Sequence, residues 1–280
     1  MISDNKNSPS CVVSGVTGYV KRHKKAFVGL GTFLATMALW YAIWAFFAWR
    51  IGISFILPSP HEAFSEFFKL LPKAEFAKAV FSSLGRVVSG YLIGMVTGAI
   101  AALLAHFILP LKVFFSPLVR VVRATPVASF ILICVLWMKT STVPVFIALL
   151  MVFPIVYENV LAGLSKTDSA LKEAAEAYSF SGIEKLMYLY IPSALPYFGS
   201  ASTVSLGLAW KSCVSAEVLS VCAASVGYYI YTSKLYFETE QLFAWTIAIV
   251  VLSVMLEYLV KAFTALISRV MGRRFVGNGK

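Results

Sequence analysis

The sequence predicts an all-α integral membrane protein with about six transmembrane helices and a cytoplasmic helix–turn–helix. Of its 280 residues, 59% are hydrophobic and only 13% are charged, whereas soluble domains carry about 25% charged residues. The stretches 26–49, 87–111 and 186–210 contain no Asp, Glu, Lys or Arg, and each exceeds the ~20 residues that a helix needs to cross a bilayer. Helices are expected because lipid offers no hydrogen-bond partners, so the backbone N–H and C=O groups must pair within the segment.

The apolar segments divide the chain into a basic N-terminal tail (1–26), a transmembrane domain (27–267) and a basic C-terminal tail (268–280). The first 25 residues are polar, and the apolar run after them is longer than the 7–15 residues of a signal-peptide core. We therefore expect the first span to stay in the mature protein. The spans are expected at about 27–49, 82–106, 124–138, 142–163, 194–220 and 242–267.

A short amphipathic helix is predicted after the first span. Ser59 as N-cap, Pro60 at the first helical position and Glu62 three residues after the cap form a capping box. Phenylalanines and a leucine then recur at helical spacing between 64 and 71. We expect this helix to lie on the membrane surface.

The second span carries small residues four apart, at Gly90, Gly94, Gly98 and Ala102. Such a ridge lets helices approach closely in lipid, so helix packing is the favoured interpretation over a binding site. The basic stretch 107–123 is expected to be a loop, and the third span is expected to begin near Pro126.

The orientation follows from the loop charges. With the N-terminus inside, the inner segments carry more than twice as many Lys and Arg as the outer segments, which is the bias of membrane proteins. Both termini and the polar segment 164–192 are thus expected in the cytoplasm.

Within that segment, two short helices are predicted. Asp168 can cap a helix that runs through Tyr178, the stretch 179–182 is a break, and Ser181 with Glu184 forms a capping box for a second helix that ends before Pro192. A partner protein could grip such a pair of helices at the membrane edge.

This segment resembles the EAA motif of bacterial ABC importer permeases. The motif residues are Glu173-Ala174-Ala175, followed by Ile191-Pro192 and Leu195-Pro196. The wider sequence, over roughly 55–265, resembles the nitrate/sulfonate/taurine-type permeases. The further matching pieces are Leu57-Pro58-Ser59-Pro60, Ser83-Leu84-Gly85-Arg86 with Gly90, Arg123-Ala124-Thr125-Pro126, Phe153-Pro154, Ala209-Trp210 and Ala216-Glu217.

The resemblance implies a type I ABC importer permease of the bacterial inner membrane. In that family the EAA loop, here 167–196, docks into the cytosolic ATPase dimer, a second permease copy completes the pathway, and an extracytoplasmic binding protein delivers substrate. The chain has no P-loop, so ATP hydrolysis belongs to a separate subunit and no cofactor is expected. The family usually has glycine six residues after the glutamate, where this chain has Ser179, so the turn is expected to be built differently. The implied ATPase-coupling residues are Glu173, Ala174, Ala175, Ser179 and Gly182.

Charged residues at membrane depth are usually functional. Lys211 lies about 22 Å along the fifth span from Pro196, and Glu217 is about 120° around the same helix, so each should face the pathway or another span. Glu158 fits either a snorkelling end residue or a gate, and Glu257 with Lys261 is expected to form an i,i+4 ion pair.

The substrate implied by the resemblance is a small anion such as nitrate, a sulfonate or taurine, and Lys211 is compatible with it. Relatives that import thiamine precursors or other heteroaromatics, and a stand-alone secondary transporter, are the alternatives. An intramembrane enzyme or a metal site is not expected, because the Cys and His residues show no ligand spacing. The net charge of +11 fits the positive-inside bias better than nucleic-acid binding.

Overall fold

The computed structural model describes residues 31–277, all of whose regular elements are helices. By its internal contacts the chain divides into two compact units, Met1–Ala63 and Phe64–Lys280. Each unit is described by itself.

The described part of the first unit holds the helix Gly31–Ile51 and the start of α2 (Pro60–Leu70). Trp44 Nε1 donates a hydrogen bond to Pro58 O at 3.0 Å, which folds the connecting segment back on the helix. The predicted capping box of α2 is confirmed, since Ser59 N donates to Glu62 Oε2 at 2.7 Å and Glu62 N donates to Ser59 Oγ at 3.3 Å.

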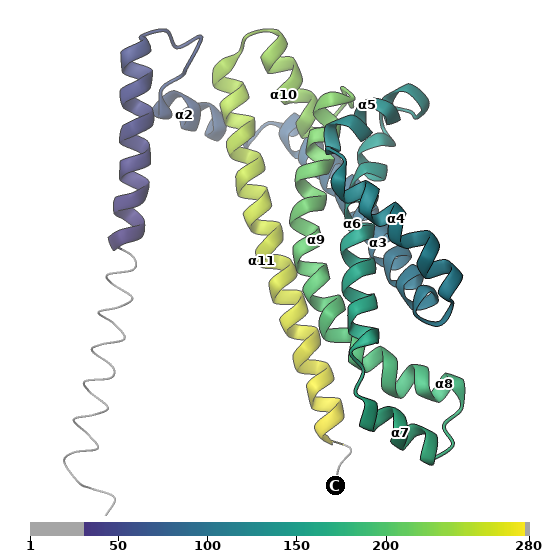
Figure 1. The fold of residues 1–280 in the computed structure, drawn as a ribbon. Coiled ribbons are helices and arrows are strands. Elements are labelled where there is room, and N and C mark those ends of the chain that lie inside the picture. The colour runs from purple at the N-terminus through teal and green to yellow at the C-terminus, as the bar shows by residue number, and fades with distance from the viewer. Residues whose placement is uncertain (1–30, 278–280) are drawn as a thin grey trace, which may run out of the picture. The chain divides into compact units, whose positions relative to one another are not determined.

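The second unit is a bundle in which two short helices project from one end and a third helix covers the opposite end (Figure 1). Its elements are α3 (Ala74–Phe107), α4 (Leu109–Ala124), α5 (Val127–Trp137), α6 (Val143–Ser165), α7 (Ser169–Ala177), α8 (Gly182–Lys185), the π-helical turn η1 (Leu186–Tyr190), α9 (Ile191–Leu219), α10 (Val226–Leu235) and α11 (Thr239–Gly277). The projecting pair is α7 and α8, and α10 lies at the far end, which is the name used below for the end away from α7 and α8.

Among the residues that the structure describes, four helices are long and apolar enough to cross a membrane: Gly31–Ile51, α3, α6 and the Thr239–Val260 part of α11. The pair α4 and α5 forms a fifth crossing if it is one broken span, bent by 105° at Thr125-Pro126. The remaining predicted span is α9, which at 29 residues is long enough but less apolar than the others. Much of the surface of α9 packs against other helices of the protein, so fewer of its side chains must be apolar to face lipid.

One sequence-based expectation about a connection is wrong. The stretch 107–123 is the helix α4 and not a loop, because Val119 and Val122 are buried on one side while the basic residues that suggested a loop stand on the exposed side. The connection between the last two predicted spans contains the short helix α10, whose N-cap is Ser225.

The glycine ridge on α3 packs against α6, as predicted. A Cβ atom built on Gly94 would lie 2.8 Å from Val152 Cβ, and one on Gly98 would lie 2.9 Å from Phe153 O. The absence of side chains thus sets the distance between the two helices.

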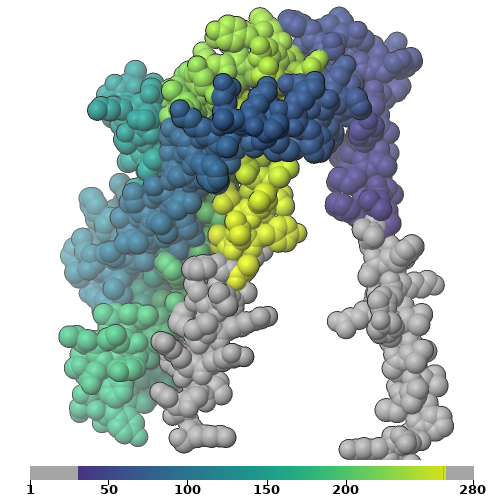
Figure 2. Space-filling view, turned by 180° about the vertical axis from the view of Figure 1, so that it is seen from behind, coloured from purple at the N-terminus to yellow at the C-terminus, as the bar shows by residue number. Residues whose placement is uncertain are grey.

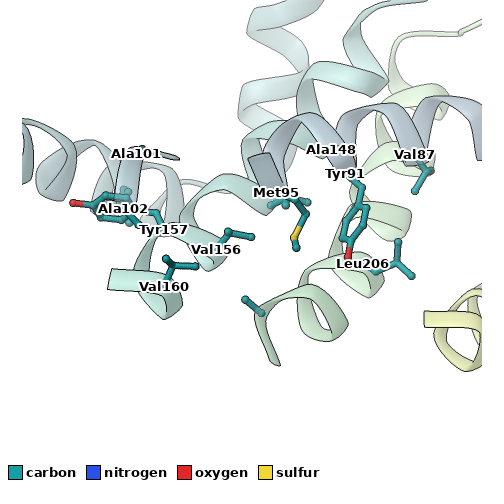
Figure 3. Packing of buried hydrophobic residues seen from close by; sticks show 14 of the residues in the cluster. Val87, Tyr91, Met95, Ala101, Ala102, Ala148, Val156, Tyr157, Val160 and Leu206 are labelled. Carbon is teal, nitrogen blue, oxygen red and sulfur yellow. The ribbon is translucent and has the colours of Figure 1, made fainter. Parts of the chain in front are cut away.

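The core of the bundle continues from α3 to α9. Tyr91 and Met95 point from α3 toward α9, beside Leu206 (Figure 3). Tyr91 Oη lies 2.5 Å from Ser202 Oγ, and Ser205 Oγ lies 3.7 Å from Met95 Sδ. The α3–α9 contact therefore has polar as well as apolar partners.

Candidate functional site

The predicted coupling residues lie on α7, in the turn that follows it and at the start of α8. Asp168 caps α7 by accepting a hydrogen bond from Ala170 N at 2.9 Å, as predicted. Ala175 is buried, whereas Glu173 and Ala174 are exposed. Ala175 thus faces the protein while its two neighbours are free to contact a partner.

Ser179 ends α7 in the left-handed conformation, with φ +56°. Ser179 N donates to Glu176 O and Phe180 N donates to Ala175 O, both at 2.9 Å, which is the Schellman pattern. The family's glycine is suited to this conformation because it has no Cβ. Serine here occupies the conformation that glycine favours, and the expectation that the turn is built differently from the family's stays a prediction.

The second projecting helix, α8, begins with the predicted capping box. Ser181 N donates to Glu184 Oε2 at 2.7 Å, and Glu184 N donates to Ser181 Oγ at 3.3 Å. These hydrogen bonds, first that of the Ser181 backbone, lower the pKa of the Glu184 carboxyl. Gly182 is exposed, with no atom of a neighbour within 4 Å of a built Cβ. An ion pair of 3.7 Å between Lys185 and Glu176 joins α8 to α7.

The prediction that the second helix ends before Pro192 is wrong. α8 continues through η1 directly into α9, and Ile191 N donates to Leu186 O, five residues back. Pro192 is the second residue of α9 and has no N–H to donate, which would break a regular α-helix. The wider π turn of η1 lies directly before it. α8, η1 and α9 thus form one uninterrupted helical segment, called the rod below, which α7 joins through a turn and which bends where it enters the bundle (Figure 1).

Two aromatic contacts hold the base of this rod to α3. The ring of Tyr190 meets His106 at 5.3 Å and Phe107 at 5.2 Å between centroids, both edge to face. The elbow formed by α7 and α8 projects beyond the bundle (green, lower left in Figure 2). It exposes large apolar side chains, and such groups gathered on a surface mark interaction sites. They are Leu171, Tyr178, Phe180 and Ile183, and the exposed Met187 and Tyr188 follow in η1.

Glu217, a predicted pathway residue, is fully buried near the C-terminal end of α9. Ser83 Oγ donates to its Oε2 at 2.7 Å and Arg86 Nη1 donates to its Oε1 at 3.0 Å. These contacts favour the alternative that Glu217 faces another span, and its pathway role stays a prediction. Neither Ser83 nor Arg86 is predicted from the sequence as a partner of Glu217, although both lie in the segment 83–86 that carries part of the family resemblance.

Lys211, the other predicted pathway residue, is exposed on α9. Within the part of the chain that the structure describes, no carboxylate pairs with its ammonium group. It belongs to an exposed stripe whose members are three or four residues apart on a helix that is otherwise largely covered. The stripe consists of Ser200, Val204, Leu208, Lys211 and Ser215.

The sequence also predicts charged residues in the membrane on α6 and α11. Glu158 on α6 forms an ion pair with Arg123 at the end of α4, with both side chains partly exposed. The expected pair of Glu257 and Lys261 lies outside the described side chains, because that of Lys261 is not described. Among the described residues, no group of three or more His, Cys, Asp or Glu could hold a metal ion.

Comparison of the sequence with known protein families identifies the family of this chain. Residues 90–273, about two thirds of the chain, match the family "Binding-protein-dependent transport system inner membrane component". The chain belongs to this family and is an ABC importer permease subunit.

Similar proteins include the putative aliphatic sulfonates transport permease protein SsuC of Bacillus subtilis, 27% identical over 74% of this chain and 75% of the relative. The taurine transport system permease protein TauC of Escherichia coli is 19% identical over 82% of this chain and 84% of its own. The nitrate import permease protein NrtB of Synechococcus elongatus is 26% identical over 54% of each chain.

Solved structures share the fold. A crystal structure of an amino acid ABC transporter with histidines matches with a TM-score of 0.56 at 20% identity, over 74% of this chain and 96% of that one. A bacterial alginate ABC transporter in complex with an alginate-bound periplasmic protein matches with a TM-score of 0.57 at 15% identity, over 90% of this chain and 97% of that one.

Proposed function

We propose that this permease imports a small anion and is driven by a cytosolic ATPase dimer that docks on the α7–α8 elbow. The observation that carries the coupling role is the elbow itself, which exposes Glu173, Ala174 and several apolar side chains beyond the bundle. It is also continuous with α9 through η1. A force on the elbow would therefore act directly on a helix in the middle of the bundle.

Glu173→Ala tests the docking role. We expect ATP-driven uptake to fall roughly tenfold, the effect of losing about 1.4 kcal/mol of docking energy. Glu238→Ala is the control, because it removes the same charge from an exposed position outside the elbow. Uptake by permease reconstituted with its ATPase and binding protein is the measurement. Unchanged uptake by Glu173→Ala, or an equal loss in Glu238→Ala, would contradict the docking role.

The anion part of the proposal rests on the relatives and on Lys211. The relatives are named for sulfonates, taurine and nitrate. In this chain the exposed stripe of α9 includes two serines and a lysine that forms no ion pair with any carboxylate that the structure describes. Such a stripe is an unusual surface to present to lipid tails, because a charge there is costly. A second permease copy would bring two such stripes together around a shared pathway, with a lysine on each.

Lys211→Met removes the charge while keeping most of the side-chain length. We expect the KM for uptake of the transported anion to rise about fivefold, as for a loss of ~1 kcal/mol of Coulomb attraction. The probes are radiolabelled nitrate, taurine and ethanesulfonate. Lys78→Met, at an exposed position on α3, is the control. An unchanged KM in Lys211→Met would remove the lysine from the pathway, and uptake of none of the three anions would refute the substrate class.

A further inference from the structure

The buried carboxylate of Glu217 contacts the start of α10 as well as α3. Gly227 N, the second residue of α10, donates to Glu217 Oε2 at 3.3 Å. Val226 N donates to Ser83 Oγ at 3.0 Å, and Tyr228 N donates to Ser225 Oγ at 2.9 Å. The first three N–H groups of α10 are thus satisfied by α3, by α9 and by its own N-cap.

This arrangement makes the carboxylate an anchor for α10. A helix N-terminus has no intrahelical acceptors for its first N–H groups, and it attracts negative charge. Most helices meet this need with a local side chain. In α10 two of the three acceptors come from other helices, so the start of α10 is fixed to α3 and to the C-terminal end of α9.

Backbone packing adds to the anchor. A Cβ built on Gly227 would lie 2.6 Å from Val218 N and 2.8 Å from Glu217 C. Both are backbone atoms, which cannot move aside as a flexible side chain can. α10 therefore touches the α9 backbone directly at the point where the carboxylate holds it.

The loop between the two helices is held in a strained form. Val221 and Ala224 have φ +50° and +52°, and a left-handed conformation costs roughly 1–2 kcal/mol for a residue with a Cβ. Valine is the less suited of the two because it is β-branched. Such strain persists only where the surroundings impose it. Here Arg86 Nη2 donates to Ala223 O at 3.4 Å, and Ser225 Oγ donates to Cys222 O at 2.7 Å.

We propose that Glu217, Ser83 and Arg86 are positioning residues for transport, which fasten α10 to the far end of α9 so that both move as one body. This inference rests on the proposed function, since it needs a force on the elbow. The rod from η1 carries that force along the 29 residues of α9, about 43 Å at 1.5 Å per residue. Glu217 stands where α9 ends and α10 begins, so it delivers the movement to the helix that covers the far end.

The functional test is the amount of substrate taken up per ATP hydrolysed, measured in the complete reconstituted transporter. We expect Glu217→Gln to lower this ratio roughly tenfold, within the usual range of coupling between sites, because the neutral side chain leaves Arg86 without its counter-charge. The double variant Arg86→Gln/Glu217→Gln removes two of the three positioning side chains, so its ratio should be at least as low as that of Glu217→Gln. Glu66→Gln, which removes a surface ion pair of 3.1 Å on α2, is the control and should keep the ratio.

A distance measurement separates positioning from general loss of structure. Spin labels are placed at Leu219→Cys on α9 and Tyr236→Cys after α10, both exposed positions. With Glu217 intact, the distance between the labels should stay the same with and without ATP. In Glu217→Gln it should broaden or change with ATP. Ser83→Ala, which removes one hydroxyl, is the milder variant and should show the same change to a smaller degree.

Three outcomes would overturn the inference: a wild-type ratio in Glu217→Gln, an unchanged label distance in that variant, or a wild-type ratio in the double variant. Failure of the proposed function has a different signature, because the wild-type complex would then show no ATP-driven uptake. A wild-type complex that transports, together with a Glu217→Gln variant that transports equally well per ATP, refutes the positioning role alone.

Discussion

The close packing of α3 on α6 gives the sharpest test of how the bundle is held together. In Gly94→Ala the new Cβ would lie 2.8 Å from Val152 Cβ and 3.1 Å from Leu149 O. Ordinary contacts are about 3.5–4.0 Å between carbon atoms, so the helices must separate by several tenths of an ångström. Overpacking of this kind costs about 1–3 kcal/mol.

A matched control lies on the same helix. Gly85 is exposed, and a Cβ there has no neighbour within 4 Å, so Gly85→Ala should stabilise α3 by up to ~1 kcal/mol through helix propensity. At about 2–4 °C per kcal/mol, Gly94→Ala should lower the unfolding temperature by roughly 2–12 °C. Gly85→Ala should leave it unchanged or raise it. Thermal unfolding of the purified permease in detergent is the assay, and a Gly94→Ala variant as stable as Gly85→Ala would refute the reasoning.

Three further predictions concern the elbow and the surface. Ser179→Gly should raise the free energy of local unfolding of the elbow by about 0.5–1 kcal/mol, because glycine adopts φ +56° without a Cβ clash. Amide exchange of the elbow residues measures this free energy, and faster exchange in the variant would contradict the prediction. The pKa of Glu184 is lowered from its ordinary value of 4.5 by its hydrogen bonds to Ser181. The capping box should therefore be at full strength above pH 4.5 and be lost as pH falls through the lowered pKa. The protection factors of the α8 amides, which compare the measured exchange rate with the intrinsic rate at each pH, should fall over that range in the wild type but not in Glu184→Gln. Glu158→Ala should change the unfolding free energy by less than about 1 kcal/mol, because its ion pair with Arg123 is partly exposed; a larger loss of thermal stability would show that the pair is more than a surface contact.

Features that depend on local sequence could be predicted. The capping boxes at Ser59 and Ser181 and the N-cap at Asp168 are set by residues within three positions of one another, and the structure confirms them. The glycine ridge was also predictable, because a four-residue spacing places its members on one face of a helix. Its partner α6 could not be named from the spacing alone.

Features that depend on tertiary contacts were missed. α4 was expected to be a loop because its basic residues were counted without their positions around a helix. The continuation of α8 into α9 was hidden by Pro192, since the π turn before it leaves no sequence signal. Arg86 was overlooked because its partner Glu217 is 131 positions away along the chain. The φ of Ser179 could not be inferred from the residue type, since serine seldom adopts the left-handed conformation.

The measurement that tests the account most directly is which side of the membrane the elbow faces. Tyr178 at the elbow and Tyr236 at the far end are 79% and 70% exposed, so a cysteine at either position is open to a membrane-impermeant maleimide. Cys134, Cys213 and Cys222 are buried, and Cys11→Ser removes the remaining cysteine. We expect the maleimide to label Tyr178→Cys only in inside-out vesicles and Tyr236→Cys only in intact spheroplasts. Labelling of Tyr178→Cys from outside the cell would contradict it, because no cytosolic ATPase could then reach the elbow.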